Sequence, residues 1–570
     1  MNTEFDTIIV GGGSAGAVLA NRLSARNGHR ILLVEAGEDT PVGAVPPAIL
    51  DSFPGTAYLN PRFTWTELEV TTEAIPHNRP DVRPRLRKYE QARVLGGGSS
   101  INGQLANRGA PGDYDEWEDR GAAGWNWDAV LPYFRKLERD MDFDGPLHGR
   151  DGPIPIRRIW PDRWPEHTKA MAAALLADGF EYRPDQNGIF ADGYYPVAIS
   201  NLDDRRVSTA IAYLDPATRL RENLTVLTGT IVTALRFEGE RCIGAVIQPR
   251  PGEQIAIRAG EVILSSGAIQ SPAQLLRAGI GPAPELRALG IPVRADRPGV
   301  GRRLMDHPSV AIAAFVMPWA RINGRNRRHL FLGLRFSSGL DGVPAGDMGA
   351  TIATKSAWHA IGDQIATFNM WVNKTYSEDG SVRLQSSDWR DMPIVDFNLL
   401  SDSRDLQRLV GAMQRFATLF ARPELRGVVA DPFPASYSDK VRQVAAINAK
   451  NRTITTVLAR LLDGPAGVRR ALLRKLVLEG PSLAALQRDE DALTSFIRRA
   501  AVGVWHASCS CRMGAANDRM AVTDTAGRVH GVAGLRVVDA SIFPVIPCAN
   551  INLPTIMLAE RIADMIIDGR

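Results

Sequence analysis

The chain has 570 residues, of which 45% are hydrophobic and 23% charged, a composition typical of a globular protein long enough for two domains. Its 67 basic and 63 acidic residues leave a net charge of +4. The basic residues are spread along the chain and form no concentrated stripe, so no nucleic-acid partner is expected.

Neither a secretory signal nor a membrane-spanning segment is expected from the sequence. It contains no run of about 18 apolar residues, so no integral membrane segment is expected. The first residues are acidic and lead into a strand pattern, unlike a secretory signal. Four cysteines are too few for a disulfide scaffold. We therefore expect a cytoplasmic protein, and the sequence does not indicate its oligomeric state.

The start of the chain has the pattern of a dinucleotide-binding unit. Residues 5–10 are rich in β-branched side chains, as in a buried parallel strand. Gly-Gly-Gly-Ser-Ala-Gly follows at 11–16, then a helical pattern at 17–23, a second strand at 31–34 and an acid, Glu35. Because strand, glycine turn, helix and acid occur in this order, the pattern favours a nucleotide cofactor over a purely structural turn.

Each residue type in this unit has a physical task. Gly11 permits the tight turn, Gly13 lets a pyrophosphate approach the backbone, and Gly16 lets helix and strand pack closely. The helix N-terminus stabilises the diphosphate charge, and Glu35 accepts hydrogen bonds from a ribose diol. The motif alone does not separate FAD from NAD. The predicted binding residues are Gly11, Gly13, Ser14, Ala15, Gly16, Glu35 and Ala36.

A second glycine-rich run lies at residues 92–104. Three consecutive glycines and two serines offer bare N–H groups and small hydroxyls for wrapping an extended polar cofactor, although a flexible surface loop has the same composition. The run resembles the first signature, R-x-L-GG-x-SS-x-N, of the glucose-methanol-choline (GMC) oxidoreductases. This resemblance implies that FAD contacts Leu95, Gly97, Ser99, Asn102, Gly103 and Gln104.

Further parts of the chain resemble the same family. Some members carry a flavin-linked His where this chain has Ile101, so noncovalent FAD is implied. Residues 261–282 resemble the second family signature, and Val232 falls where relatives meet the adenine. The resemblance implies that Val232, Ala268, Trp505, Asp539, Ala540, Pro554 and Thr555 also bind the cofactor.

The family resemblance also implies the fold. We expect an α/β protein with a Rossmann-like FAD-binding domain at 1–310 and 500–570, including cap and loop segments within 40–225. A second α+β substrate domain, built on an antiparallel sheet at 311–499, should cover the flavin. In that sheet Trp371 and Val372 are candidate pocket walls, with ordinary sheet packing as the alternative.

Two other segments have informative patterns. Residues 112–140 hold six aromatic side chains at mixed spacing, which favours core packing over ligand stacking. Residues 440–490 are helical in pattern, with arginines between apolar positions. A solvated surface helix is expected there, and contact with a membrane surface or a partner is the alternative.

The candidate catalytic base is His506. Removing the hydroxyl proton of an alcohol requires a base poised near neutral pH, and a lone His is otherwise an ordinary structural residue. Its context, Trp505-His506-x-x-Cys509-Ser510-Cys511-Arg512-Met513-Gly514, resembles the family pattern H-x-x-G-T-C-R-M-G. Cys509 replaces the family Gly, and its bulk is expected either to narrow the pocket, which Trp505 also lines, or to shift the turn. With no second cysteine pair, Cys509 and Cys511 are expected to be packing residues and not metal ligands.

Asn552 is the predicted second catalytic residue. It lies in a run, residues 550–560, that matches the family pattern N-x-N-x-P-T-I-M-x-A-E. An amide donates and accepts hydrogen bonds, so Asn552 would orient the substrate hydroxyl. Capping of the last helix is the alternative role.

Within the family, bacterial 5-hydroxymethylfurfural oxidases are the members most similar in several short runs. The resemblance implies oxidation of aryl or furanic primary alcohols to aldehydes, with O2 as acceptor and H2O2 as product. A dehydrogenase with a quinone or another acceptor is the nearest alternative, followed by a hydroxynitrile lyase and a nonenzymatic flavin-binding module. The runs are residues 107–109, 113–117, 152–156, 372–374 and 503–508.

Overall fold

A mainly parallel sheet built from the start of the chain carries the first glycine turn. This computed structural model describes residues 3–74, 85–322, 327–436, 439–478 and 480–569. In it, β1 (Glu4–Val10) lies between β2 (Ile31–Val34) and β13 (Glu253–Leu264). All three strands are parallel, and β1 and β2 are rich in fully buried apolar residues, as a sheet covered on both faces requires. The sheet is completed by β10 (Leu224–Leu227), β11 (Ile231–Glu238), β12 (Arg241–Arg250) and β25 (Leu535–Val537), in the order β10-β2-β1-β13-β12-β11 with β25 beside β13.

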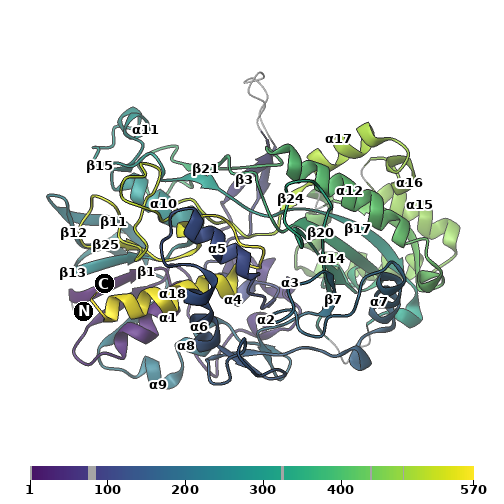
Figure 1. Cartoon of the computed structure of the whole chain (residues 1–570), viewed down its shortest axis with the longest axis horizontal. Coiled ribbons are helices and arrows are strands. Elements are labelled where there is room, and N and C mark those ends of the chain that lie inside the picture. The colour runs from purple at the N-terminus through teal and green to yellow at the C-terminus, as the bar shows by residue number, and fades with distance from the viewer. Residues whose placement is uncertain (1–2, 75–84, 323–326, 437–438, 479, 570) are drawn as a thin grey trace.

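The first and last long helices of this lobe pack against each other. Helix α1 (Ser14–Ser24) follows the glycine turn, and α18 (Asn552–Ile567) lies beside it at the opposite end of the chain (Figure 1). Arg22 and the fully buried Glu560 form a 2.6 Å ion pair between the two helices. The FAD-binding region predicted from two distant segments is thus joined by direct contacts.

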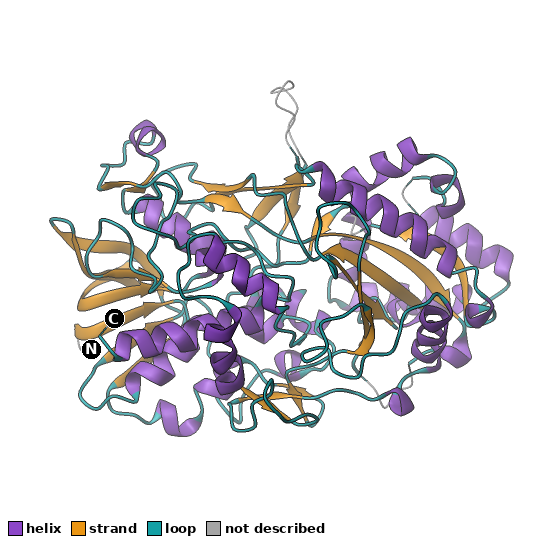
Figure 2. Cartoon of the chain, viewed as in Figure 1, coloured by secondary structure: helices purple, strands orange, loops and turns teal. Residues whose placement is uncertain are grey.

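The second large sheet is antiparallel and lies in the other half of the molecule, with helices over its outer side (Figure 2). Its order is β23-β17-β20-β19-β18-β7, with β24 (Val502–Gly503) beside β17. Helix α12 (Ser403–Leu419) packs on β17 and β20, and α17 (Glu490–Ala500) packs on α12. The strands are β7 (Gly193–Pro196), β17 (Pro308–Val316), β18 (Leu330–Phe336), β19 (Met348–Ala353), β20 (Ile365–Val372) and β23 (Val429–Ala435).

This arrangement confirms the predicted fold class, a Rossmann-like sheet joined to a second unit on an antiparallel sheet. Strand β7 comes from the segment predicted to belong to the first domain, so the second sheet is not built from 311–499 alone. A smaller five-stranded sheet is formed by β3 (Glu69–Glu73), β4 (Leu86–Lys88), β16 (Arg302–Leu304), β21 (Gly380–Arg383) and β22 (Ile394–Leu399).

The aromatic side chains of residues 112–140 form part of the core, as predicted. Tyr114, Trp117, Trp125 and Phe134 have no exposed surface. They are carried by α5 (Pro111–Asp119), α6 (Trp127–Leu137) and the turn between these helices. Their rings pack against one another in edge-to-face and tilted arrangements, and none of them lines the predicted cofactor site.

The helical segment predicted at 440–490 is only partly a solvated surface. It comprises α13 (Asp439–Ala445), α14 (Ala449–Leu462), α15 (Ala466–Leu476) and α16 (Leu483–Leu486). One side of α14 and α15 is exposed, whereas Leu462 and Leu473 are buried in a cluster with Phe315 and Phe433. Arg469 is also buried, where it pairs with Asp431 at 2.7 Å. In the part of the chain that the structure describes, no helix has the length and apolar character needed to cross a membrane.

Candidate active site

One continuous cavity of about 1330 Å³ reaches from the glycine turns to the antiparallel sheet. It is lined by residues from both ends of the chain, because α1 and α18 meet beside it. Both predicted catalytic residues, His506 and Asn552, line it. So do most of the predicted cofactor and pocket residues, namely Gly11, Gly13, Ser14, Ala15, Glu35, Ala36, Gly97, Asn102, Gly103, Val232, Ala268, Trp371, Trp505, Asp539, Ala540 and Thr555.

The other predicted site residues lie behind the cavity wall. Consecutive strand residues point to opposite faces, so Trp371 faces the cavity and Val372 is fully buried on the other side. Gln104 donates to the carbonyls of Asp51 and Ser52, each at 3.2 Å. The residues placed outside the lining are Gly16, Leu95, Ser99, Gln104, Pro554, Val372 and Cys509.

The two glycine-rich turns touch each other at the cavity wall. Gly11 has φ +100°, and a side chain there would meet the Ser265 carbonyl. Gly97 has φ +53°, and a Cβ on it would lie 2.7 Å from the Cα of Gly13. Because only glycine permits both the backbone angle and this approach, the turns leave bare backbone facing the cavity.

The polar groups of this wall fit an FAD. The Glu35 carboxylate accepts hydrogen bonds from Gly12 N at 2.9 Å and Gly37 N at 2.7 Å, which leaves oxygen lone pairs for a ribose. In the described part of the chain, the buried Ser265 Oγ and Gln91 Oε1 have no hydrogen-bond partner although both residues line the cavity. Buried polar atoms without partners and bare glycine backbone facing the cavity suit a long polar ligand.

Asp306 holds the loop that carries His506. Its Oδ1 accepts hydrogen bonds from the backbone N of His307 at 2.7 Å, of Val504 at 3.1 Å and of His506 at 3.0 Å. Burial raises the pKa of this carboxyl to about 7. A single side chain therefore links the start of β17 to the catalytic loop.

A chain of hydrogen bonds sets the tautomer of His506. The Pro547 carbonyl can only accept, so the His307 Nε2, 3.1 Å away, carries the hydrogen. Burial lowers the pKa of His307 to about 3, so its ring is neutral and its Nδ1 is an acceptor. His506 Nδ1, at 2.8 Å, must therefore donate to it. The Nε2 of His506 is left with a lone pair on the cavity side.

The electrostatics of His506 agree with this assignment. Burial, followed by the neighbouring His307, lowers the pKa of His506 well below its ordinary value. The ring is therefore neutral at neutral pH. A neutral imidazole with a lone pair facing a cavity is able to accept a proton.

Asn550, and not Asn552, contacts His506. The Asn550 Nδ2 lies 3.0 Å from the His506 Nε2. Asn552 lies two residues further on, where its Oδ1 accepts from the Ser14 hydroxyl at 2.7 Å. The capping alternative for Asn552 is wrong, because the N-cap of α18 is Ile551 and Asn552 is the first helical residue. Asn552 thus joins the end of the chain to the first glycine turn.

Cys509 occupies a strained backbone position. Its φ is +71°, in the left-handed region that favours glycine, which is the residue type in the family pattern. Its side chain has no exposed surface and belongs to the main core, as does that of Cys511. The prediction that both cysteines are packing residues is confirmed. Cys509 is also predicted to line the pocket, but the structure places it outside the cavity lining.

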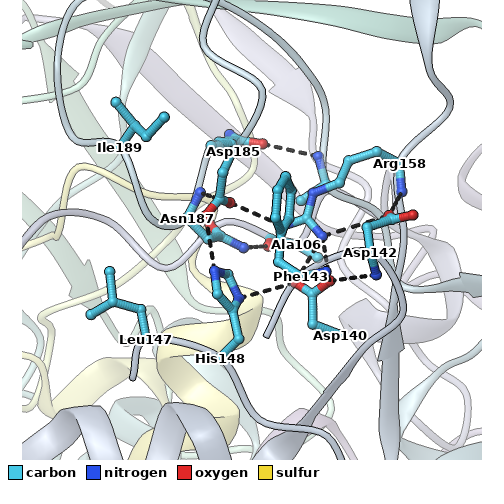
Figure 3. Close-up of polar contacts among 12 residues, drawn as sticks. Ala106, Asp140, Asp142, Phe143, Leu147, His148, Arg158, Asp185, Asn187 and Ile189 are labelled. Carbon is cyan, nitrogen blue, oxygen red and sulfur yellow. Dashed lines mark hydrogen bonds and ion pairs between the residues drawn. The ribbon is translucent and has the colours of Figure 1, made fainter. Parts of the chain in front are cut away.

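A second buried polar cluster lies outside the cavity (Figure 3). His148 Nδ1 is 3.1 Å from Asp140 Oδ2, and its Nε2 is 2.8 Å from Asp185 Oδ2. Nε2 hydrogen-bonds to Asp185, whereas Nδ1 lies at ion-pair distance from Asp140 and Glu138 without hydrogen-bond geometry. A ring surrounded by three carboxylates is favoured in its cationic form. Although burial alone would lower its pKa, interactions with Asp140, Asp185 and Glu138 raise it to about 10.

Two arginines complete this cluster. Arg158 binds both oxygens of Asp140, and Arg108 binds both oxygens of Glu138 at 2.6 and 2.7 Å. These guanidinium groups supply the positive charge that a metal ion would bring to such a set of donors. The cluster is therefore a self-contained ion network between the 138–158 loop and Asp185.

Comparison with known proteins identifies the family. The GMC oxidoreductase family matches residues 5–309 and 376–559. The chain belongs to this family. Membership confirms the predicted fold and shows an FAD-dependent enzyme that oxidises alcohols.

Individual relatives cover almost the whole GMC chain. A 5-(hydroxymethyl)furfural oxidase from Methylovorus sp. (strain MP688) is 44% identical, over 99% of each chain. An oxygen-dependent choline dehydrogenase from Vibrio vulnificus (strain YJ016) is 31% identical, over 100% of this chain and 95% of the relative. The crystal structure of pyridoxine 4-oxidase from Mesorbium loti superposes with a TM-score of 0.79 at 27% identity, over 99% of each chain.

The residues that the sequence did not single out are His307, Asp306 and Asn550. All three have a signal in the sequence. Asp306-His307 stands directly before the strand that opens the second sheet, and Asn550 belongs to the same motif as Asn552. What the sequence lacks is the spatial relation, because His307 and His506 are 199 residues apart.

Proposed function

We propose that this enzyme oxidises primary alcohols on aryl or furan rings to aldehydes, with His506 as the base. The observation that carries the proposal is the His506 Nε2 lone pair, held toward the cavity by the hydrogen bonds from Pro547 through His307. The 44% identity to a 5-(hydroxymethyl)furfural oxidase supports the ring-bearing substrate class.

The contact between His506 and Asn550 defines where a hydroxyl binds. In the structure the Asn550 amide donates to the His506 Nε2 at 3.0 Å. An alcohol hydroxyl would replace this hydrogen bond, because its oxygen can accept from the Asn550 amide while its O–H donates to His506 Nε2. The hydroxyl proton then moves to Nε2, which makes His506 an imidazolium. FAD held in this cavity would supply the hydride acceptor, so loss of the proton to His506 and of the hydride from the carbinol carbon would leave an aldehyde. Asn550 takes the orienting role that the sequence assigned to Asn552.

Different chemical groups of the cofactor are proposed to contact different parts of the site. The Gly11 and Gly97 turns with α1 would hold the diphosphate, and Glu35 the ribose. Asn552, bound to Ser14, stands beside the diphosphate end of α1. Ile101 lines the cavity and has no nucleophilic atom, which supports noncovalent FAD.

O2 is the proposed acceptor, with H2O2 as product, and an oxygen electrode tests it. Peroxide should form in proportion to aldehyde. Aldehyde formation only with a quinone or dye would instead establish the dehydrogenase alternative.

The assignment of the base is tested by His506→Ala. We expect a loss of about 10²–10⁴-fold in kcat/KM for benzyl alcohol, with FAD content unchanged. His530→Ala, which removes a partly buried His that lies outside the cavity, is the matched control. Flavin bleaching by anaerobic alcohol should occur in the wild type and would exclude a hydroxynitrile lyase. Unchanged turnover in His506→Ala would overturn the assignment.

A further inference from the structure

The antiparallel sheet extends the cavity wall away from His506. Strands β17 and β20 face each other in register, with Ser309 opposite Trp371 next to the catalytic loop. Ala313 lies opposite Thr367, four residues further along β17. At about 3.4 Å per residue, this row is roughly 13 Å from the first. The cavity therefore extends well beyond the space that a single ring needs.

The far end of the cavity is enclosed by apolar side chains. Five cavity-lining residues belong to one buried apolar cluster there, and Leu472 packs against it. Two of them come from α14 and α15, so the 440–490 segment forms the wall opposite the sheet at this end. The five residues are Ala313, Ile365, Phe433, Leu462 and Leu473.

Several polar side chains that line this part of the cavity are already engaged, although the buried His329 Nδ1 has no hydrogen-bond partner among the described residues. The Thr367 hydroxyl accepts from Asn369 Nδ2 at 3.1 Å. Lys355 pairs with Asp363 at 3.3 Å, and His359 Nδ1 accepts from Gly362 N at 3.2 Å. These groups offer a substrate little polar attraction, so the far end favours an apolar occupant.

We infer that the alcohol oxidised by this enzyme carries an extended apolar group, such as a long alkyl chain on the ring. This inference rests on the proposed function. The hydroxyl binds beside His506 and Asn550, where it replaces their mutual hydrogen bond, and the apolar tail lies along β17 to the cluster of Leu462 and Leu473. A compact polar furan alcohol would leave this end filled only by water against apolar walls.

A chain-length series tests the inference. The kcat/KM for para-alkyl benzyl alcohols should rise about fourfold for each added methylene until the cluster is reached. Binding is measured separately by calorimetry with tertiary alcohols of the same lengths, which have no carbinol hydrogen to lose. Their Kd should fall in parallel.

A pair of variants locates the effect. Leu472→Asp places a charge at the half-buried far wall and should lower kcat/KM and affinity for the longest alcohols by about tenfold or more. Benzyl alcohol should be unaffected. Leu461→Asp, on the exposed side of the preceding helix and outside the cavity lining, is the control and should change neither.

The outcomes separate this inference from the proposed function. If benzyl alcohol is oxidised but neither kcat/KM nor Kd improves with chain length, the inference is overturned and the proposed function stands. If Leu472→Asp and Leu461→Asp affect long alcohols equally, the far end is not the tail site. If no alcohol reduces the flavin, the proposed function itself fails.

Discussion

Replacing His148 should remove a stabilisation that depends on pH. Its pKa is raised from 6.5 to about 10 in the folded chain, which corresponds to about 5 kcal/mol at 1.36 kcal/mol per pH unit. Because the folded pKa is the higher one, this stabilisation is fully present below pH 6.5 and is lost as the pH rises through 10. His148→Gln also leaves three buried carboxylates, those of Glu138, Asp140 and Asp185, facing two arginines.

The assay compares melting temperatures of the FAD-loaded wild type and His148→Gln from pH 6 to 10. Other titrating groups affect both proteins alike, so the difference in Tm reports His148. It should be largest below pH 6.5 and shrink toward pH 10. Arg150→Gln, which breaks an exposed pair with Asp144 in the same loop, should cost less than about 1 kcal/mol. A difference in Tm that stays constant across this range would refute the assignment of His148 as a buried cation.

Other expected outcomes concern the active site. His307→Phe removes the acceptor for His506 Nδ1, so kcat should fall by up to about 10⁴-fold through loss of the correct tautomer. KM and FAD content should change little. A fall in FAD content as large as the fall in kcat would point to a structural role for His307. Because burial lowers the His506 pKa, kcat/KM should hold its plateau as pH falls through 6.5, and an acid limb centred at or above 6.5 would contradict this. Asn550→Ala should lower kcat/KM with FAD retained, and Asn552→Ala should weaken FAD binding; equal effects on both would reject the division of roles. Acid precipitation should release the flavin into solution, since Ile101 offers no covalent link, and yellow pelleted protein would disprove it.

Local sequence was enough to place the cofactor end of the molecule. The turn at Gly11, the strand before it and the acid Glu35 are close in sequence, and each obeys a steric or hydrogen-bonding rule that needs no tertiary context. All three occur in the structure as the pattern predicts, and both residues line the cavity. The aromatic core around Trp117 followed from composition in the same way.

Contacts between segments that lie far apart in the chain could not be predicted from the sequence. The motif contains two asparagines two residues apart, and only the turn before α18 decides that Asn550 meets His506. Likewise, the amphipathic pattern of α15 indicated a helix, but whether its apolar side met solvent or the cavity depended on where β17 lay. Leu473 is buried because the sheet supplies Ala313 and Phe433 as partners.

The hydrogen bond between Ser14 and Asn552 has a consequence for biosynthesis. Its two residues are 538 positions apart, so at about 5–20 residues per second the ribosome needs roughly half a minute to two minutes to make the second after the first. During that time β1 and its glycine turn are complete but lack α18. The wall that Ser14 and Asn552 form together is therefore complete only after residue 552 has been synthesised.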